Sequence, residues 1–193
     1  MGNIRIYLAS ESPRRHQLLE QLGIDFQPVR VNIDESPVGA ESPYHYVERL
    51  SLAKARAGWQ MVAHENAPVL GADTCVVIDN NILGKPRDKQ HGLWMLEQLS
   101  GTTHQIYSGV AITKGTLQQV CVNTSQVSFR TLTTKERLDY WQTGEPCDKA
   151  GGYAIQGKAA AFITQLEGSY SAVMGLPLYE TAQLLSEFGV DVI

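Results

Sequence analysis

The sequence predicts a mixed α/β domain in which helices flank a sheet. Its 193 residues fit the range of roughly 100–200 that one domain usually takes. Segments with strand-like and helix-like hydrophobic spacing alternate along the chain, without repeats or a linker-like segment. One of them, Val69–Ile78, is apolar on both faces, which is typical of a strand inside a covered sheet. We therefore expect residues 1–193 to form a single domain, with room for two lobes.

The first half of the chain carries two matching helix-start signals. Ser12-Pro13 and Ser42-Pro43 each place a capping serine before a proline at the first helical position. The expected elements are a strand at Ile4–Ala9, a helix from Pro13 that Gly23 ends, a strand at Phe26–Ile33 and a helix from Pro43 to about Val62.

The second half carries a hairpin signal at Lys114-Gly115 and a capping box that runs from Thr133 to Glu136. The expected elements after Val69–Ile78 are a turn at Asn80-Asn81, a helix from Asp88 to Gly101, strands at Gln105–Thr113 and Gln119–Thr131, a helix from Thr133 to near Gly144, a strand at Ala159–Leu166 and a helix at Pro177–Phe188.

Composition excludes several classes of protein. Hydrophobic residues make up 43% and charged residues 19%, which is an ordinary globular balance. A net charge of −4 disfavours stable nucleic-acid binding, because phosphate contacts supply most of that affinity. Three cysteines without CxxC spacing argue against a disulfide framework and a cysteine zinc site. No apolar stretch approaches the ~18 residues of a membrane span, so we expect a cytoplasmic protein without a membrane partner.

The start of the first helix is a candidate phosphate site. Arg14 and Arg15 lie in its first turn, where the helix dipole disfavours cations. An anion on the free N–H groups would reverse that cost, with the arginines and the hydroxyls of Ser10 and Ser12 completing a cradle. A solvated pair of surface arginines is the alternative, and this segment alone does not choose between them.

Two acidic residues are candidates for metal binding or acid–base chemistry. Asp73 lies inside the apolar strand Val69–Ile78, where a carboxylate is costly unless it is paired, hydrogen-bonded or bound to a cation. Glu35 follows a strand in the same way. Magnesium usually takes one or two carboxylates together with substrate phosphates. A purely structural hydrogen-bonding role for Asp73 is the alternative.

Three lysines, Lys54, Lys85 and Lys149, lie in apolar or turn-forming contexts, although each alone is more typical of a surface residue. Seven of the sixteen basic residues lie in these motif-like segments: Arg14, Arg15, Lys54, Lys85, Arg87, Lys149 and Lys158. This points to a local anion site in an acidic protein.

These segments together resemble the Maf family of nucleoside triphosphate pyrophosphatases over nearly the whole chain. The motifs in family order are Leu8-Ala9-Ser10-Glu11-Ser12-Pro13-Arg14-Arg15, Asp34-Glu35, Ala53-Lys54-Ala55, Gly71-Ala72-Asp73-Thr74, Gly84-Lys85-Pro86, the segment from Asp148 to Gly157, Gly168-Ser169-Tyr170 and Gly175-Leu176-Pro177. The resemblance implies an inosine-triphosphate-pyrophosphatase-like fold of the Maf/Ham1 type, with an elongated sheet and a cleft between two lobes. It also implies hydrolysis between the α and β phosphates with a divalent cation (Mg²⁺ or Mn²⁺) and a homodimer.

The resemblance assigns roles to single residues. Asp73 falls where the family has its proposed general base, and Glu35 matches an acidic position used for metal. Ser10, Arg14, Arg15, Lys54 and Lys85 fall on phosphate-site positions, to which the residue patterns add Ser12 and Lys149. Glu11 departs from the small residue that is common there and puts a negative charge beside the cradle.

Arg14, Thr74 and Gln156 match the branch associated with dTTP and UTP, whereas the 7-methyl-GTP branch has Trp, Gln and Glu. A neutral pyrimidine edge suits an amide that both donates and accepts hydrogen bonds. We therefore expect a dTTP/UTP pyrophosphatase, with modified pyrimidine nucleotides as further candidates and a house-cleaning role or a link to septum formation. A regulatory nucleotide- or nucleic-acid-binding protein of cell division with little hydrolysis is the alternative.

Overall fold

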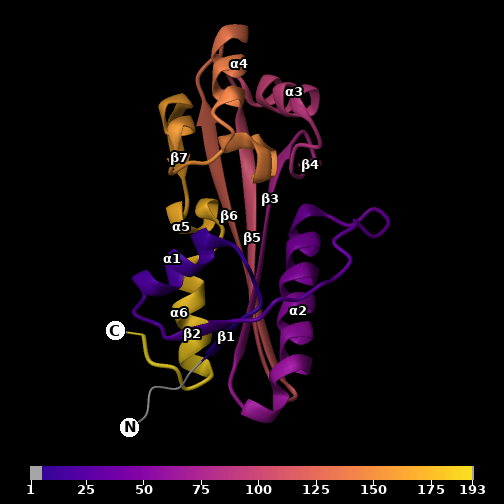
Figure 1. Cartoon of the computed structure of the whole chain (residues 1–193), viewed down its shortest axis with the longest axis vertical. Coiled ribbons are helices and arrows are strands. Elements are labelled where there is room, and N and C mark those ends of the chain that lie inside the picture. The colour runs from indigo at the N-terminus through magenta and orange to yellow at the C-terminus, as the bar shows by residue number, and fades with distance from the viewer. Residues whose placement is uncertain (1–5, 193) are drawn as a thin grey trace. The chain divides into compact units, whose positions relative to one another are not determined.

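The computed structural model describes residues 6–192, and the first two residues of the predicted strand at Ile4–Ala9 lie outside them. Within the described residues, seven strands form one sheet in the order β2-β1-β3-β5-β6-β7, with β4 paired to β3 (Figure 1). The pairs β1/β2 and β1/β3 are parallel, whereas β3/β4 and β6/β7 are antiparallel. This mixed sheet with flanking helices confirms the predicted α/β class.

The chain divides into two compact units. Within the described residues, one unit comprises 6–73, 108–123 and 175–192, and the other comprises 74–107 and 124–174. Three strands contribute residues to both units: β3 (Val69–Ile78), β5 (Thr103–Lys114) and β6 (Leu117–Phe129). The cleft between lobes stays a prediction.

The first unit is built around a long helix packed closely on two strands. Its other elements are β1 (Ile6–Leu8), α1 (Pro13–Gln21), β2 (Phe26–Pro28), α2 (Pro43–Val62), η1 (Ala63–Glu65) and α6 (Leu178–Glu187). A side chain at Gly71 of β3 would overlap the Ser51 carbonyl of α2, and one at Gly109 of β5 would lie 2.6 Å from the Val47 carbonyl. Glycine at these two positions therefore lets the backbone of α2 approach the sheet.

The second unit encloses the larger apolar core. Its other elements are β4 (Asn81–Leu83), α3 (Lys89–Leu99), α4 (Thr134–Gln142), η2 (Glu145–Asp148), η3 (Ala150–Gly152), η4 (Lys158–Phe162), β7 (Ile163–Glu167) and α5 (Tyr170–Met174). Leucines of α3 pack there against Phe129, Tyr140, Tyr153 and Phe162. These rings meet edge to face, which is a favourable geometry for aromatic packing.

Three of the predicted helix starts are confirmed by their caps. The side chains of Ser42, Asp88 and Thr133 each accept a hydrogen bond from a first-turn N–H, and the capping box with Glu136 is complete. The predicted hairpin at Lys114-Gly115 joins β5 to β6, with Gly115 at φ +60°.

Three predictions of local structure are wrong. The strand expected at Phe26–Ile33 ends at Pro28, and the strand expected at Ala159–Leu166 begins only at Ile163 because 158–162 form a 3-10 helix. The chain after the turn at Asp79-Asn80 pairs back on β3 as β4, where only a turn was expected. The short helix α5 was not predicted.

Candidate active site

The arginine at the start of α1 folds back onto the chain before the helix. Ser10 Oγ accepts a hydrogen bond from the Ser12 N–H (3.2 Å) and another from Nη1 of Arg15 (3.2 Å). Nε of Arg15 donates to the Gly175 carbonyl oxygen (2.8 Å). Ser12 is the N-cap residue, but its side chain makes no capping bond, and no acidic residue lies in the first turn. The predicted cradle residues Ser10, Ser12 and Arg15 are therefore brought together.

A buried lysine joins the two candidate acidic residues. Nζ of Lys54 lies 2.7 Å from Oδ1 of Asp73 and 2.7 Å from Oε1 of Glu35. The side chains of Lys54 and Asp73 are each 11% exposed, whereas that of Glu35 is 53% exposed. A buried carboxylate is costly unless it is paired with a cation or hydrogen-bonded. Asp73 thus has, in the Lys54 ammonium, the partner that a carboxylate in an apolar strand needs.

The arginine and the acidic pair share one electrostatic environment. Burial lowers the pKa of the Arg15 guanidinium, and the negative charges of Asp73 and Glu35 oppose that change. A cation disfavoured by burial gains from any further anion placed beside it. The start of α1 and the Asp73–Lys54–Glu35 group therefore form one charged site in the first unit.

Side chains of α2 hold the segment that carries Glu35. The hydroxyl of Tyr46 donates to the Glu35 carbonyl oxygen (3.0 Å), and Nη2 of Arg49 donates to the Ser36 carbonyl oxygen (3.1 Å). Tyr46 and Arg49 were not predicted to contribute to the site, although they belong with Lys54 to the predicted helix. Only the folded position of 34–36 reveals their contribution.

The carboxylates of Glu35 and Asp73 are suitable protein ligands for a divalent cation. Among residues 6–192, no three His, Cys, Asp or Glu side chains gather into a complete metal site. Two carboxylates nevertheless converge on one cationic group, the ammonium of Lys54. One or two carboxylates completed by substrate phosphates are the usual ligand set of Mg²⁺. Glu35 and Asp73 would hold such an ion.

Apart from Arg14, the remaining predicted residues belong to the second unit. The Gly151 N–H donates to the Gly84 carbonyl oxygen (3.0 Å), which places the chain around Lys85 beside the chain around Lys149. Lys149 forms an ion pair with Asp148. Gln156 is exposed on a turn, and Thr74 is half-buried in β3. Arg14 is half-buried in α1 of the first unit.

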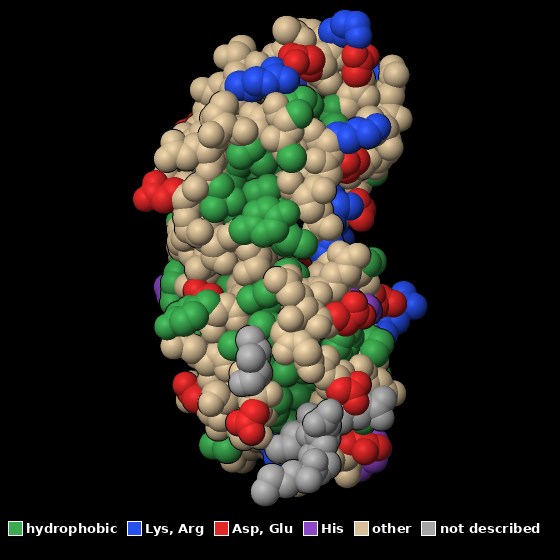
Figure 2. Space-filling model, turned by 90° about the vertical axis from the view of Figure 1, so that its left-hand side faces the viewer, with side chains coloured by type: hydrophobic (Ala, Val, Ile, Leu, Met, Phe, Trp, Pro, Cys, Tyr) green, Lys and Arg blue, Asp and Glu red, His purple; other side chains and the backbone are tan. Residues whose placement is uncertain are grey.

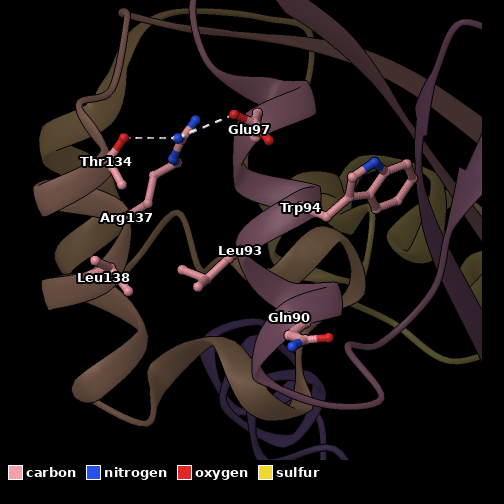
Figure 3. Close-up of a pocket in the computed structure, with 7 residues that line it drawn as sticks. All are labelled: Gln90, Leu93, Trp94, Glu97, Thr134, Arg137 and Leu138. Atoms are coloured by element: carbon pink, nitrogen blue, oxygen red, sulfur yellow. Dashed lines mark hydrogen bonds and ion pairs between the residues drawn. The ribbon is translucent and has the colours of Figure 1, made fainter.

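A separate hollow lies between α3 and α4, with a volume of about 270 Å³ (Figure 3). Arg137 spans it, with Nη2 3.2 Å from Glu97 and 3.3 Å from the Thr134 hydroxyl. None of the predicted site residues is among those that line it: Gln90, Leu93, Trp94, Glu97, Thr134, Arg137 and Leu138. The predicted chemistry does not involve this hollow.

The described surface and helices bear on possible partners. On the face drawn in Figure 2, Lys and Arg side chains lie near Asp and Glu side chains and form no separate basic surface. Of the helices in residues 6–192, none has both the length and the apolar composition needed to cross a bilayer.

Comparison with known proteins places nearly the whole chain in a family. The family model described as Maf-like protein matches residues 5–188. A protein of Alkalilimnicola ehrlichii named dTTP/UTP pyrophosphatase is 53% identical over 190 residues, covering 96% of this chain and 94% of that protein. One of Vibrio cholerae with the same name is 52% identical over 184 residues, covering 95% and 98%.

A search of solved structures matched the Staphylococcus aureus Ham1 protein with a TM-score of 0.48 and 12% identity, covering 65% of this chain and 71% of that one.

Proposed function

Because this chain belongs to the Maf family, we propose that it is a nucleoside triphosphate pyrophosphatase that hydrolyses dTTP and UTP to the monophosphate and pyrophosphate. The names of the relatives at 52–53% identity support this substrate class. The observation that carries the proposal for this chain is the Asp73–Lys54–Glu35 group, in which Asp73 and Lys54 are buried and which shares its electrostatic environment with Arg15. It combines carboxylates with cationic groups, as attack of water on a phosphoanhydride requires.

In this proposal Asp73 is the general base. Its Oδ1 atom lies 2.7 Å from Nζ of Lys54, and a carboxylate can accept a proton from the attacking water. Asp73 also orients that water for in-line attack on the α phosphorus. A carboxylate that is rigidly held in a strand suits this task, because β3 limits its movement.

The basic residues would bind the triphosphate. Arg15 and the hydroxyls of Ser10 and Ser12 would hold phosphate oxygens at the start of α1, where helix N–H groups also face the anion. Lys54, Lys85, Lys149 and Arg14 would stabilise the negative charge that grows on the pyrophosphate leaving group. Such electrostatic stabilisation is usually the largest single contribution to catalysis.

A divalent cation, Mg²⁺ or Mn²⁺, is the proposed cofactor, with Glu35 and Asp73 as its protein ligands. When bound, such an ion neutralises charge on the phosphate oxygens. The exposed side chain of Glu35 can turn toward a nucleotide that carries an ion with it, because little packing restrains it.

Base selectivity is assigned to Arg14, Thr74 and Gln156. The Gln156 amide can donate and accept a hydrogen bond at once, and the edge of uracil or thymine presents both an N–H and carbonyl oxygens. The exposed position of Gln156 on its turn makes the amide available to a ligand.

The proposal also keeps two predictions made from the sequence. We expect a homodimer, which sedimentation equilibrium of the purified chain would test. We expect a cytoplasmic location, which fractionation of cells that produce the chain would test.

The decisive experiment measures pyrophosphate release from dTTP, UTP, dCTP, dATP, dGTP and 7-methyl-GTP with Mg²⁺ or Mn²⁺. We expect fast release from dTTP and UTP and at least tenfold slower release from the others. Release of orthophosphate instead of pyrophosphate would contradict cleavage between the α and β phosphates. Nucleotide binding without release of either product would favour a regulatory binding role.

A further inference from the structure

The residue assigned to base selectivity lies on a tight turn. Residues 154–157 form this turn, which the Gly157 N–H closes by donating to the Ala154 carbonyl oxygen (3.0 Å). Gln156 is exposed on it, and the 3-10 helices η3 and η4 lie just before and just after. On so short a turn, the positions of the two ends set the direction of the side chain between them.

One carboxylate holds the far end of the turn. Oε2 of Glu145 accepts a hydrogen bond from the Lys158 N–H (3.0 Å), and Oε1 accepts one from the Ala159 N–H (3.4 Å). These N–H groups open the 3-10 helix η4, where no earlier carbonyl can pair with them. Glu145 therefore acts as a cap that is supplied from another segment, thirteen and fourteen residues earlier in the sequence.

A phenol holds the near end and joins the two ends together. The hydroxyl of Tyr140 accepts a hydrogen bond from the Ala154 N–H (3.2 Å) and donates one to Oε1 of Glu145 (2.7 Å). Tyr140 is 3% exposed and packs edge to face on Phe162. Both ends of the turn are thus tied to one pair of side chains that α4 and η2 position.

The turn closes directly over the carboxylate. A Cβ atom at Gly157 would overlap the Glu145 carboxylate, so only glycine permits this approach. Gly144 precedes Glu145 and adopts φ +76°, a conformation that favours glycine and reverses the chain after α4. Gly144 and Gly157 therefore allow the Glu145 carboxylate to lie close against the turn.

The protonation states agree with these hydrogen bonds. Burial raises the pKa of Glu145, but the bonds from Lys158, Tyr140 and Ala159 lower it, so that it lies below its usual value. Burial and the bond to Glu145 raise the pKa of Tyr140 well above its usual value. At neutral pH Glu145 is therefore an ionised acceptor and Tyr140 a protonated donor.

We propose that Tyr140 and Glu145 are positioning residues for base recognition, which fix the 154–157 turn so that the Gln156 amide meets the edge of the pyrimidine. This proposal rests on the proposed function, since it takes Gln156 as the residue that reads the base. Neither residue needs to touch the nucleotide, because each acts through the backbone of the turn.

The experiment compares the full-length chain with Glu145→Gln, Tyr140→Phe, Gln156→Ala and the double variant of Glu145→Gln with Gln156→Ala. Glu97→Gln is the matched control, because Glu97 is a half-exposed acid of the same unit that pairs with Arg137 away from the turn. Amide hydrogen exchange of 154–160 reports on the turn, and kcat and KM for dTTP and dCTP report on selectivity.

We expect Glu145→Gln and Tyr140→Phe to speed exchange in 154–160 and to lower the dTTP:dCTP ratio of kcat/KM by roughly tenfold, since each loses hydrogen bonds to or from a charged group. The loss should appear mainly in the KM for dTTP, because the phosphate chemistry is untouched. The double variant should be no less selective than Gln156→Ala, because Glu145 acts through Gln156. Glu97→Gln should change neither quantity.

Three results would overturn the proposal. Faster amide exchange with unchanged selectivity would show that Tyr140 and Glu145 only stabilise the turn and do not act on base recognition. Additive losses in the double variant would show that Glu145 does not act through Gln156. Unchanged selectivity in Gln156→Ala would show that Gln156 does not read the base, as the role of Tyr140 and Glu145 requires. If the unmodified chain released no pyrophosphate, the proposed function would fail, and the same comparison would be made on the Kd of non-hydrolysable dTTP and dCTP analogues.

Discussion

Nζ of Lys54 lies 2.7 Å from Oδ1 of Asp73, and both side chains are 11% exposed. The two residues lie on α2 and β3, and their contact depends on the close approach of helix and strand at Gly71. Lys54 is also 2.7 Å from Glu35, so one ammonium contacts both acidic residues of the site. Four predictions concern this site and the cores that support it.

Replacement of Asp73 by asparagine should abolish turnover while nucleotide binding stays largely intact. The amide keeps the size of the side chain but cannot accept a proton from water, and loss of a general base costs roughly 10²- to 10⁴-fold in rate. Pyrophosphate release and the Kd of a non-hydrolysable dTTP analogue measure the two effects. Asp79→Asn, on the exposed turn after the same strand, is the control. A near-normal rate in Asp73→Asn would contradict the assignment of Asp73 as the general base.

Replacement of Lys54 by glutamine should destabilise the free protein and make it more sensitive to divalent cations. Removing one partner of a buried ion pair costs roughly 3–5 kcal/mol. Here the value should lie at the low end, because the partly exposed Glu35 can turn to solvent. Mn²⁺ without nucleotide should then raise the Tm of the variant more than that of the unmodified chain, since the ammonium no longer competes for the carboxylates. Lys89→Gln, on the exposed start of α3, serves as control, and equal Mn²⁺ shifts in all three proteins would contradict a cation site at Glu35 and Asp73.

Replacement of Gly71 by alanine should harm both stability and activity. The new methyl group would overlap the Ser51 carbonyl and lie 2.5 Å from the Ala55 nitrogen, which are backbone atoms that cannot move aside cheaply. We expect a loss of about 3 kcal/mol in unfolding free energy, and a fall in kcat/KM as α2 and Lys54 shift away from Asp73. Urea unfolding and pyrophosphate release measure these effects. Gly84→Ala is the matched control, because its methyl group would meet no atom within 4 Å, and equal losses in both variants would refute this explanation.

Protonation of His104 should make the second unit sensitive to mild acid. Burial lowers the pKa of His104 to about 4, below the value of about 6.5 expected in the unfolded chain. Between these two pKa values the unfolded chain binds a proton that the folded chain does not, so the free energy of unfolding falls as the pH drops through this range. Above this range the contribution of His104 to that free energy is fully present. From pH 7 to pH 5 this residue should remove about 2 kcal/mol of unfolding free energy.

The interior contacts of His104 explain this behaviour. Its Nε2 shares a hydrogen bond with the Tyr153 hydroxyl (2.8 Å), its Nδ1 has no hydrogen-bond partner, and the rings of Phe129 and Tyr153 enclose it. Urea titrations at several pH values should show a smaller pH dependence for His104→Gln. The exposed His64→Gln should behave like the unmodified chain. An identical pH dependence in His104→Gln would assign the acid sensitivity to other groups.

Local sequence was sufficient for the helices whose ends are chemically marked. Ser42, Asp88 and Thr133 cap their helices with their own side chains, a signal that spans only three residues. It was not sufficient for 158–162, because the amides of Lys158 and Ala159 are satisfied by Glu145, a partner that residue spacing cannot reveal. The alternation in Phe26–Ile33 likewise predicted a strand that continues to Ile33, whereas only the three residues Phe26–Pro28 pair with β1.

Residue type, short-range spacing and ordered motifs were enough to predict the α/β class, the family and the candidate acidic and basic residues. Only the folded chain reveals that Lys54 joins Asp73 to Glu35, that Arg15 turns back to Ser10 and Gly175, and that Tyr140 and Glu145 hold the turn of Gln156. Several of these contacts connect residues far apart in the chain, such as Lys54 with Asp73 and Arg15 with Gly175. They form only when packing, such as that of α2 on Gly71, brings the backbones close enough for short polar contacts.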